Sequence, residues 1–273
     1  MASVAIWRIP TPDRHGYSGR QHSQRDRRAP GPPSIWDDYR RVMAMRLRQV
    51  VLVACDLDRV EAEIVEGLAV EACVHDLGVG QFGLRNVLFP VGDSLLEVVS
   101  PVEDGTAAGR HLVRRGGDGG YMVILQTDDL DGFGDRLGEL GVRVVLEASM
   151  PGIRGLHLHP RDVGGAILSV DETDDWTDWP WAGPDWREHR WTGSASGIVA
   201  VEIQADDPAA MAGRWGEVLG RPVEETVVAL DGGEVRFLPV LDDRGEGLAG
   251  MEVRAHRHAD LEIGGVRFAL RPA

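Results

Sequence analysis

Three stretches of this 273-residue chain decide its fold: QVVLVACDLD (49–58), MVILQTDDLD (122–131) and AVEIQADDPA (200–209). Each is a short run rich in apolar and β-branched residues that ends in aspartate, as a strand leading into a turn would. Each is followed by apolar residues three or four positions apart, the spacing of an amphipathic helix. Asp56, Asp129 and Asp207 (or a neighbouring Asp) are expected to cap these helices by accepting a hydrogen bond from a free backbone N–H group.

Three further strand candidates follow each predicted helix. They are 69–75, 84–91 and 94–100, then 142–147, 154–159 and 165–171, then 222–230, 234–240 and 248–255. We expect Gly67, Gly141 and Gly220 to end the three helices in the left-handed conformation. Gln49 and Met122 lie 73 residues apart, and Glu97 and Ser169 lie 72 apart, so both ends of the unit keep one period. The pattern predicts a repeated β-α-β-β-β module.

The repeat divides the chain into four regions. Residues 43–175 hold modules one and two, and 197–273 hold a third module. Its tail, 259–272, is hairpin-like and is either an addition or the stub of a fourth unit that begins at 248–255. Residues 176–196 form a linker rich in Trp, interrupted by Pro180 and Pro184, which exclude a helix. We expect this linker to be a rigid aromatic strap packed against both halves, with a lid over a ligand as the alternative.

Residues 1–42 differ from the rest of the chain. They hold eight Arg against four Asp, contain five Pro, and show no apolar period. Such a segment buries too little apolar surface to offset its ordering entropy, so a disordered basic leader is expected. A start codon placed too far upstream, an organelle transit peptide and a basic anchor for an acidic partner are the alternatives.

Composition excludes several classes of protein. The net charge is −15, and residues 43–273 alone hold 21 Arg against 40 acidic residues, which argues against a nucleic-acid partner. No apolar run approaches the length of a membrane span. Cys55 and Cys73 are too few for a disulfide framework and are expected to be reduced, buried core thiols. We expect a cytoplasmic protein, and a homodimer is left open.

The repeat and its turns resemble the vicinal oxygen chelate superfamily, which includes glyoxalase I, methylmalonyl-CoA epimerase, extradiol dioxygenases and the bleomycin-resistance binding proteins. The likeness lies in VVLVACDLD, GDSLLEVVSP, MVILQTDDLD, LHLHPRDVGGAILSVDE and DPAAMAGRWGEVLGRPVEE, and covers about residues 43–273. It looks closest to the broad glyoxalase-like group. The resemblance implies an α+β fold in which tandem modules pair into a curved mixed sheet around a cavity.

The resemblance also implies divalent-metal ligands at the first and last strands of the paired modules, which here are Gln49, Glu97, Met122 and Ser169. Hard divalent cations prefer carboxylate, imidazole or amide oxygen ligands. Met122 offers a soft thioether and Ser169 a neutral hydroxyl. We therefore expect no cofactor and no usual metal centre. A divalent metal, if one is bound, would be held by Gln49 and Glu97.

Glu97 is the strongest candidate for a catalytic residue. It lies within the apolar strand LLEVV, where a charged side chain must face either solvent or a functional cavity, since burial without a partner is costly. His157 and His159 alternate along a predicted strand and so share a face, which makes them candidate acid–base partners of Glu97. The alternative is that these histidines are satisfied locally; His159 lies in a His-Pro pair at a turn.

Further residues are candidates for the rim of the cavity. His75 ends a predicted strand, while Arg85 and Asn86, with Gln81, follow the glycines of GVGQFG, which lack the Lys-Ser/Thr of a phosphate loop. By family analogy this loop lies near the cavity mouth, where Arg85 could hold an anionic substrate. The predicted ligand-binding set consists of Gln49, His75, Arg85, Asn86, Met122 and Ser169.

Two functions fit this reading. The first is a binding protein that holds a small metabolite or a drug-like ligand between modules one and two without the usual metal. The alternative is a lyase, isomerase or dioxygenase-type enzyme acting on a small oxygenated substrate through Glu97 and His157 or His159. A scaffold whose modules only mediate oligomerisation is a third option. Fold alone does not choose among them.

Overall fold

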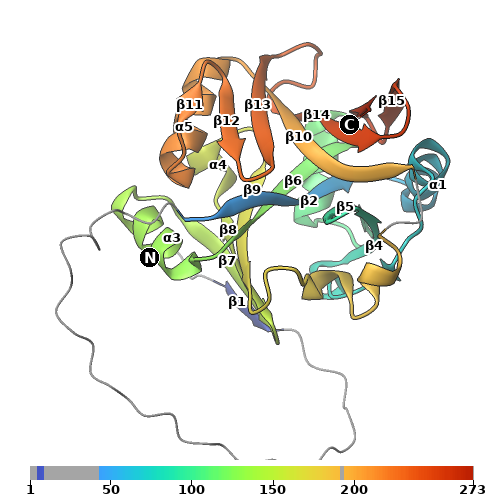
Figure 1. Ribbon diagram of the computed structural model, residues 1–273, viewed down its shortest axis with the longest axis horizontal. Helices are drawn as coiled ribbons and strands as arrows, with labels where there is room; N and C mark the ends of the chain where they lie inside the picture. The colour runs from blue at the N-terminus through green and yellow to red at the C-terminus, as the bar shows by residue number, and fades with distance from the viewer. Residues whose placement is uncertain (1–4, 9–42, 191–193, 273) are drawn as a thin grey trace, which may run out of the picture.

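A computed structural model describes residues 5–8, 43–190 and 194–272, which form two mixed β-sheets with a few helices (Figure 1). The strands of the first sheet are β1 (Ala5–Arg8), β2 (Met45–Val53), β3 (Val74–His75), β4 (Leu84–Val91), β5 (Ser94–Pro101), β6 (Gly119–Thr127), β7 (Val144–Met150), β8 (Ile153–Leu158) and β9 (Ile167–Thr173). Those of the second sheet are β10 (Ala195–Ala205), β11 (Val223–Glu224), β12 (Val227–Leu230), β13 (Gly233–Pro239), β14 (Gly247–Ala255), β15 (Ala259–Ile263) and β16 (Val266–Arg271).

The pairing in the first sheet repeats across its centre. The order is β1-β7-β8-β9-β6-β2-β5-β4-β3, so each module contributes a half and the two first strands, β2 and β6, meet antiparallel. Within each half the first strand lies parallel to the last, β2 to β5 and β6 to β9. The predicted α+β fold of paired β-α-β-β-β modules in a curved mixed sheet is therefore confirmed.

The second sheet repeats this pattern with a shortened partner. Its order is β11-β12-β13-β10-β14-β16-β15. β10 lies parallel to β13, β14 lies parallel to β16, and β10 meets β14 antiparallel. In this arrangement β14 takes the place of a first strand, and β15 and β16 follow it without an intervening helix. That topology matches a fourth unit reduced to its strands.

The longer helices are α1 (Leu57–Leu68), α2 (Ala107–Arg115), α3 (Leu130–Glu139) and α5 (Pro208–Leu219), with one turn, α4, at Pro160–Val163. The three predicted caps are confirmed: the side chains of Asp56, Asp129 and Asp207 each accept a hydrogen bond from the backbone N–H three residues on. The helix ends were predicted less well than the caps. Gly220 ends α5 in the left-handed conformation, as expected. Gly67 does not end α1, because the helix continues to Leu68 and Ala69 adopts the left-handed conformation after it. The helix α2 was not among the predicted elements.

The first strand of the structure falls within the basic leader. β1 pairs parallel with the edge strand β7, with Ala5 opposite Leu146. This differs from the expectation of a leader without regular structure. The rest of the leader, residues 1–4 and 9–42, lies outside the described residues.

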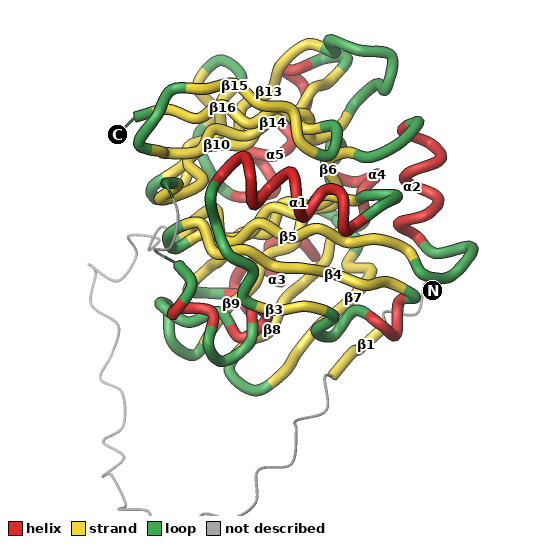
Figure 2. Tube along the Cα trace, turned by 90° about the vertical axis from the view of Figure 1, so that its right-hand side faces the viewer, coloured by secondary structure: helices red, strands yellow, loops and turns green. Residues whose placement is uncertain are grey.

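The larger apolar core lies between the two sheets and is built from their facing sides and from α1, α3 and α5. Figure 2 shows α1 lying between β5 of the first sheet and the strands of the second. The backbone N–H of Gly264, in the β15–β16 turn, donates to Glu63 Oε2 at 3.2 Å, and Arg257 Nη2 donates to the carbonyl oxygen of Gly67 at 2.7 Å. Thus α1 of module one covers the strand pair that lacks a helix of its own.

The cysteines differ from the expectation of two buried core thiols. Cys55 is exposed, and its backbone N–H donates to Asp118 Oδ1 at 2.7 Å. Cys73 is half-buried, and burial raises the pKa of its thiol to about 12. Among the helices of the described residues, none is long and apolar enough to cross a membrane.

Because α1 packs against the β15–β16 pair, the two sheets are expected to unfold together. Ile263→Ala, at a side chain only 3 % exposed, should lower the free energy of unfolding by about 2–4 kcal/mol and keep one transition. Far-UV circular dichroism and tryptophan fluorescence in urea should report that same transition. Val113→Ala, at an exposed side chain, is the control and should change stability by less than about 0.5 kcal/mol. Two separate transitions would show that the halves are independent.

Candidate functional site

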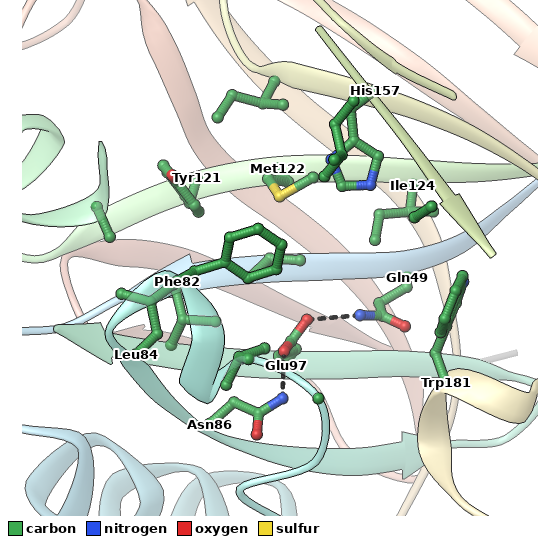
Figure 3. Close-up of a pocket in the computed structure, with 18 of the residues that line it drawn as sticks. Gln49, Phe82, Leu84, Asn86, Glu97, Tyr121, Met122, Ile124, His157 and Trp181 are labelled. Carbon is green, nitrogen blue, oxygen red and sulfur yellow. Dashed lines mark hydrogen bonds between the residues drawn. The ribbon is translucent and has the colours of Figure 1, made fainter. Parts of the chain in front are cut away.

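A cavity of about 310 Å³ lies on the concave face of the first sheet, between modules one and two (Figure 3). Most of its lining is apolar and comes from both modules, including Val51, Leu84, Leu88, Val99, Ile124, Val145, Leu146, Ala148 and Ile167. Its polar side chains are few: Gln49, Asn86, Glu97, Tyr121, His157, Asp171 and the indole of Trp181. An apolar pocket with a few convergent polar groups is the usual form of a small-molecule site.

A β-bulge in β2 places Gln49 in this cavity. The pairing of β2 with β6 shifts between Leu47 and Gln49, so that Arg48 is the extra residue. A bulge lets two consecutive side chains serve one face of a sheet. Gln49 lines the cavity, and Arg48 is buried beside it against the rings of Trp179 and Trp186, with its guanidinium about 5 Å from each ring centre.

Glu97 is buried at the floor of the cavity and is held by two side-chain amides. Gln49 Nε2 donates to Glu97 Oε2 at 2.7 Å, and Asn86 Nδ2 donates to Oε1 at 2.7 Å (Figure 3). Trp179 Nε1 donates to Gln49 Oε1 at 2.7 Å, and because an indole is only a donor, this bond fixes which end of the amide faces Glu97. Burial raises the pKa of Glu97, and the two amide donors oppose that rise.

Asp171 is the second buried carboxyl group of the cavity, and the sequence analysis did not single it out. Ser169 Oγ donates to its Oδ1 at 2.5 Å, and Trp181 Nε1 donates to its Oδ2 at 2.7 Å. Burial raises the pKa of Asp171 to about 7, against the opposing effect of these two donors. A signal was present in the sequence, since Asp171 follows Ser169 on the same strand face, in the otherwise apolar run ILSVD.

His157 is the only described histidine that lines the cavity. It lies on β8, and burial lowers the pKa of its imidazole to about 4, so the ring is neutral near pH 7. In Figure 3, His157 and Glu97 occupy opposite sides of the cavity, with Met122 between them. Tyr121 lines one end, and burial raises the pKa of its phenol.

The structure brings Gln49, Asn86, Glu97, Met122 and His157 of the predicted set together in the cavity lining. Four other predicted residues do not line the cavity. Ser169 is buried beneath Asp171. His159 caps α4, where its Nδ1 accepts from the N–H of Arg161 at 3.1 Å. His75 and Arg85 lie outside, paired with Glu61 at 2.9 Å and Asp58 at 2.8 Å. His159 is therefore satisfied locally, as the alternative interpretation expected. Because β8 ends at Leu158, His157 and His159 do not share a strand face.

The Trp strap, residues 176–190, closes one end of the cavity. Trp179 and Trp186 are fully buried and belong to the apolar cluster on the concave face of the first sheet. This corrects the expectation that the rings pack against both halves of the chain. Trp181 lines the cavity and binds Asp171, so the strap also contributes directly to the pocket wall (Figure 3). Trp191 lies outside the described residues.

The corresponding face of the second sheet carries ion pairs instead of an apolar pocket. Glu202 on β10 lies between Arg236 and Arg267, and Arg236 Nη1 also contacts Glu252 Oε2 at 2.8 Å. These charged groups form ion pairs with one another at a partly exposed surface. The candidate site therefore belongs to modules one and two.

The four positions at which the resemblance implies metal ligands do not fit a hard divalent cation. The amide oxygen of Gln49 accepts from Trp179, the hydroxyl of Ser169 donates to Asp171, and Met122 offers only sulfur. Within the described part of the chain, no three His, Cys, Asp or Glu side chains are grouped so as to hold a metal. Function without the usual metal remains our expectation.

No protein-family model matches the chain, and no curated protein matches it. Among solved structures, a hypothetical protein from Staphylococcus aureus is similar over 85 % of this chain and 100 % of its own, with a TM-score of 0.64 and 14 % identity. This likeness and the observed strand order agree with the fold of tandem β-α-β-β-β modules that the sequence predicts. The likeness to the Staphylococcus aureus protein concerns the fold alone.

Shorter matches cover about half of this chain. A methylmalonyl-CoA epimerase from Mycobacterium tuberculosis matches 47 % of this chain and 88 % of its own, with a TM-score of 0.42 and 25 % identity. A single-substitution variant of the Streptomyces coelicolor enzyme of that name, in complex with 2-nitronate-propionyl-CoA, matches 49 % of this chain and 99 % of its own, with a TM-score of 0.43 and 21 % identity.

The hydrogen bond from Trp179 to Gln49 should contribute to the free energy of unfolding in addition to the packing of the indole ring. Trp179→Phe leaves a buried amide oxygen without a donor and should cost about 1–3 kcal/mol beyond the loss of volume. Trp186→Phe is the matched control, because this equally buried ring donates to Asp178, a more exposed carboxylate that water can reach. Urea unfolding of the two variants gives the comparison. Equal losses would show that the Gln49 contact adds nothing.

Asp171 should make stability depend on pH. Its pKa in the folded state lies near 7, above the ordinary value of 3.8, so the folded state holds an extra proton between those values. The free energy of unfolding contributed by this group therefore falls as pH rises from about 4 to 7 and is constant above that. Asp171→Asn should remove that slope, measured as the difference between wild type and variant in urea unfolding at pH 5, 6, 7 and 8. Parallel pH profiles would contradict the raised pKa.

Proposed function

We propose that the chain binds a small, mainly apolar ligand in the cavity between modules one and two. The observation that carries the proposal is an apolar pocket of about 310 Å³ with two buried carboxyl groups in its lining, Glu97 and Asp171. Burying a carboxyl group is costly unless other groups bond to it. A ligand with polar groups at matching places would use both carboxyls for orientation, while the apolar walls supply affinity.

The details of the site fit binding better than turnover. Both oxygens of Glu97 already accept amide hydrogen bonds, which hold the carboxyl group in one orientation. His159 lies outside the cavity and is engaged by its own helix turn. Of the predicted acid–base set, Glu97 and His157 alone line the pocket, from opposite sides. A fixed polar floor under apolar walls suits the recognition of a metabolite or a drug-like compound.

A proton-transfer enzyme is the second candidate. The observation in its favour is that Glu97 is buried in the cavity lining, where burial raises the pKa of its carboxyl group. A carboxyl group in that position can exchange a proton with a bound substrate. Such a lyase or isomerase would act on a small oxygenated molecule, with the neutral ring of His157 on the opposite side. A binder returns its ligand unchanged, whereas an enzyme converts it, and mass spectrometry of the recovered ligand separates the two.

Filling the cavity should abolish binding. Met122 lies at the centre of the pocket, and Met122→Trp should weaken binding of the neutral apolar dye N-phenyl-1-naphthylamine at least tenfold. Leu241→Trp, at an exposed position on the loop between β13 and β14, adds the same ring away from the cavity and should leave the affinity unchanged. Dye fluorescence titrated with protein gives both constants. Equal affinities for the two variants would place the dye elsewhere, and the proposal would fail.

A further inference from the structure

The cavity lining has an uneven distribution of charge. It contains two acidic side chains, Glu97 and Asp171, and no arginine, in a chain without lysine. Its single histidine, His157, is neutral near pH 7 because burial lowers its pKa to about 4. Any formal charge that the pocket lining offers to a ligand is therefore negative.

Neither acid has a cationic partner among the described residues. Glu97 is held by the amides of Gln49 and Asn86, and Asp171 by the hydroxyl of Ser169 and the indole of Trp181. All four partners are neutral donors. Such donors compensate part of the cost of burying a carboxylate, but a charged partner would compensate more of it.

Arg48, Arg110 and Arg114 do not line the cavity. Arg48 is buried under the strap, where it stacks on Trp179 and Trp186 and donates to the carbonyl oxygen of Asp93. Arg110 and Arg114 on α2 partly oppose the burial that raises the pKa of the Tyr121 phenol, but neither of them lines the cavity. These cations do not supply the missing charge.

Aromatic rings complete the lining. Phe82, Tyr121 and Trp181 contribute to the wall, and Figure 3 shows the rings of Phe82 and Trp181 beside the pocket near Glu97. The face of an aromatic ring attracts a cation, most strongly where water is excluded. Acidic groups and aromatic faces in one apolar pocket favour the same kind of ligand.

We infer that the pocket selects a lipophilic amine: a protonated nitrogen on an apolar, preferably aromatic body. This inference rests on the proposed binding function and names its ligand class. The cation would take the place of the partner that Glu97 and Asp171 lack, and the apolar body would fill the space between modules. Carboxylates and phosphates are disfavoured, because their charge would lie beside two buried acids.

One feature could favour an anion instead. The first turn of α2 reaches the lining through Ala107 and Ala108, and helix N-termini attract negative charge. Its N-cap Thr106 already accepts from the N–H of Gly109 at 3.0 Å. Two buried acids outweigh this partial charge, and an anionic probe tests that conclusion directly.

The test uses three probes that share one ring system: 1-naphthylmethylamine, 1-naphthylmethanol and 1-naphthoic acid. Their affinities for the full chain are measured by calorimetry at pH 8, above the pKa of Asp171. The amine should bind at least tenfold more tightly than the alcohol, and the acid more weakly than both. If the alcohol or the acid binds as tightly as the amine, the ligand class is wrong while the binding function stands. If none of the three binds, and the neutral dye does not bind either, the proposed function fails as well.

Substitutions test whether Asp171 and Glu97 cause the preference for the amine. Asp171→Asn and Glu97→Gln should each lower the affinity for the amine at least tenfold and that for the alcohol less than threefold. Glu66→Gln, which removes an acid from the exposed face of α1, is the control and should change neither. If an acid variant fails to fold, the three-probe series on the unaltered chain still decides the question. Equal losses for amine and alcohol in both folded variants would overturn the charge-based selection.

Discussion

Gln49 ties the strap to the floor of the cavity through the two ends of one amide group. Its oxygen accepts from Trp179 and its nitrogen donates to Glu97, so neither end can turn without leaving a buried partner unsatisfied. Asp171 repeats the connection in module two, where it binds the strap directly through Trp181. Each carboxyl group of the pocket is thus joined to a tryptophan of the same strap. The shape of the cavity depends on these contacts as much as on the curvature of the sheet.

This linkage explains how the Trp strap is held in place although its regular structure is limited to two single-turn 3-10 helices, Pro180–Ala182 and Trp186–Glu188. Two fully buried indoles and a stacked Arg48 anchor it to the concave face. Burial lowers the pKa of Arg48 to about 9, because the guanidinium is largely removed from water. Aromatic faces and backbone carbonyls compensate that burial in place of a carboxylate partner.

The repeat in the sequence was sufficient to predict the β-α-β-β-β modules and the helix caps, because both follow from periodicity and local hydrogen bonding. The pairing of the modules was expected from the family resemblance and not from the repeat. The sequence also indicated that Glu97 lines a cavity, because an acidic side chain inside an apolar strand must face either solvent or a cavity. Asp171 was missed because its module-one counterpart, Val99, is apolar, so a comparison of repeats gives no warning there. His159, His75 and Arg85 were assigned to the site by neighbourhood in sequence, yet each is satisfied by a partner close by in the chain or on α1. The bulge at Arg48 could not be foreseen, because it interrupts the alternation by which strand faces are assigned.

The packing of α1 against the last strand pair sets the order in which the chain can be completed. Residues 57–68 emerge early from the ribosome, but the turn that bonds Glu63 lies some 200 positions later. Until β15 and β16 have been synthesised, one side of α1 lacks the strands against which it packs, and the apolar layer between the sheets is incomplete. Contacts of such long sequence separation form slowly. The β15–β16 pair therefore completes the apolar layer between the two sheets, and its contact with α1 can form only after residues 259–271 have been synthesised.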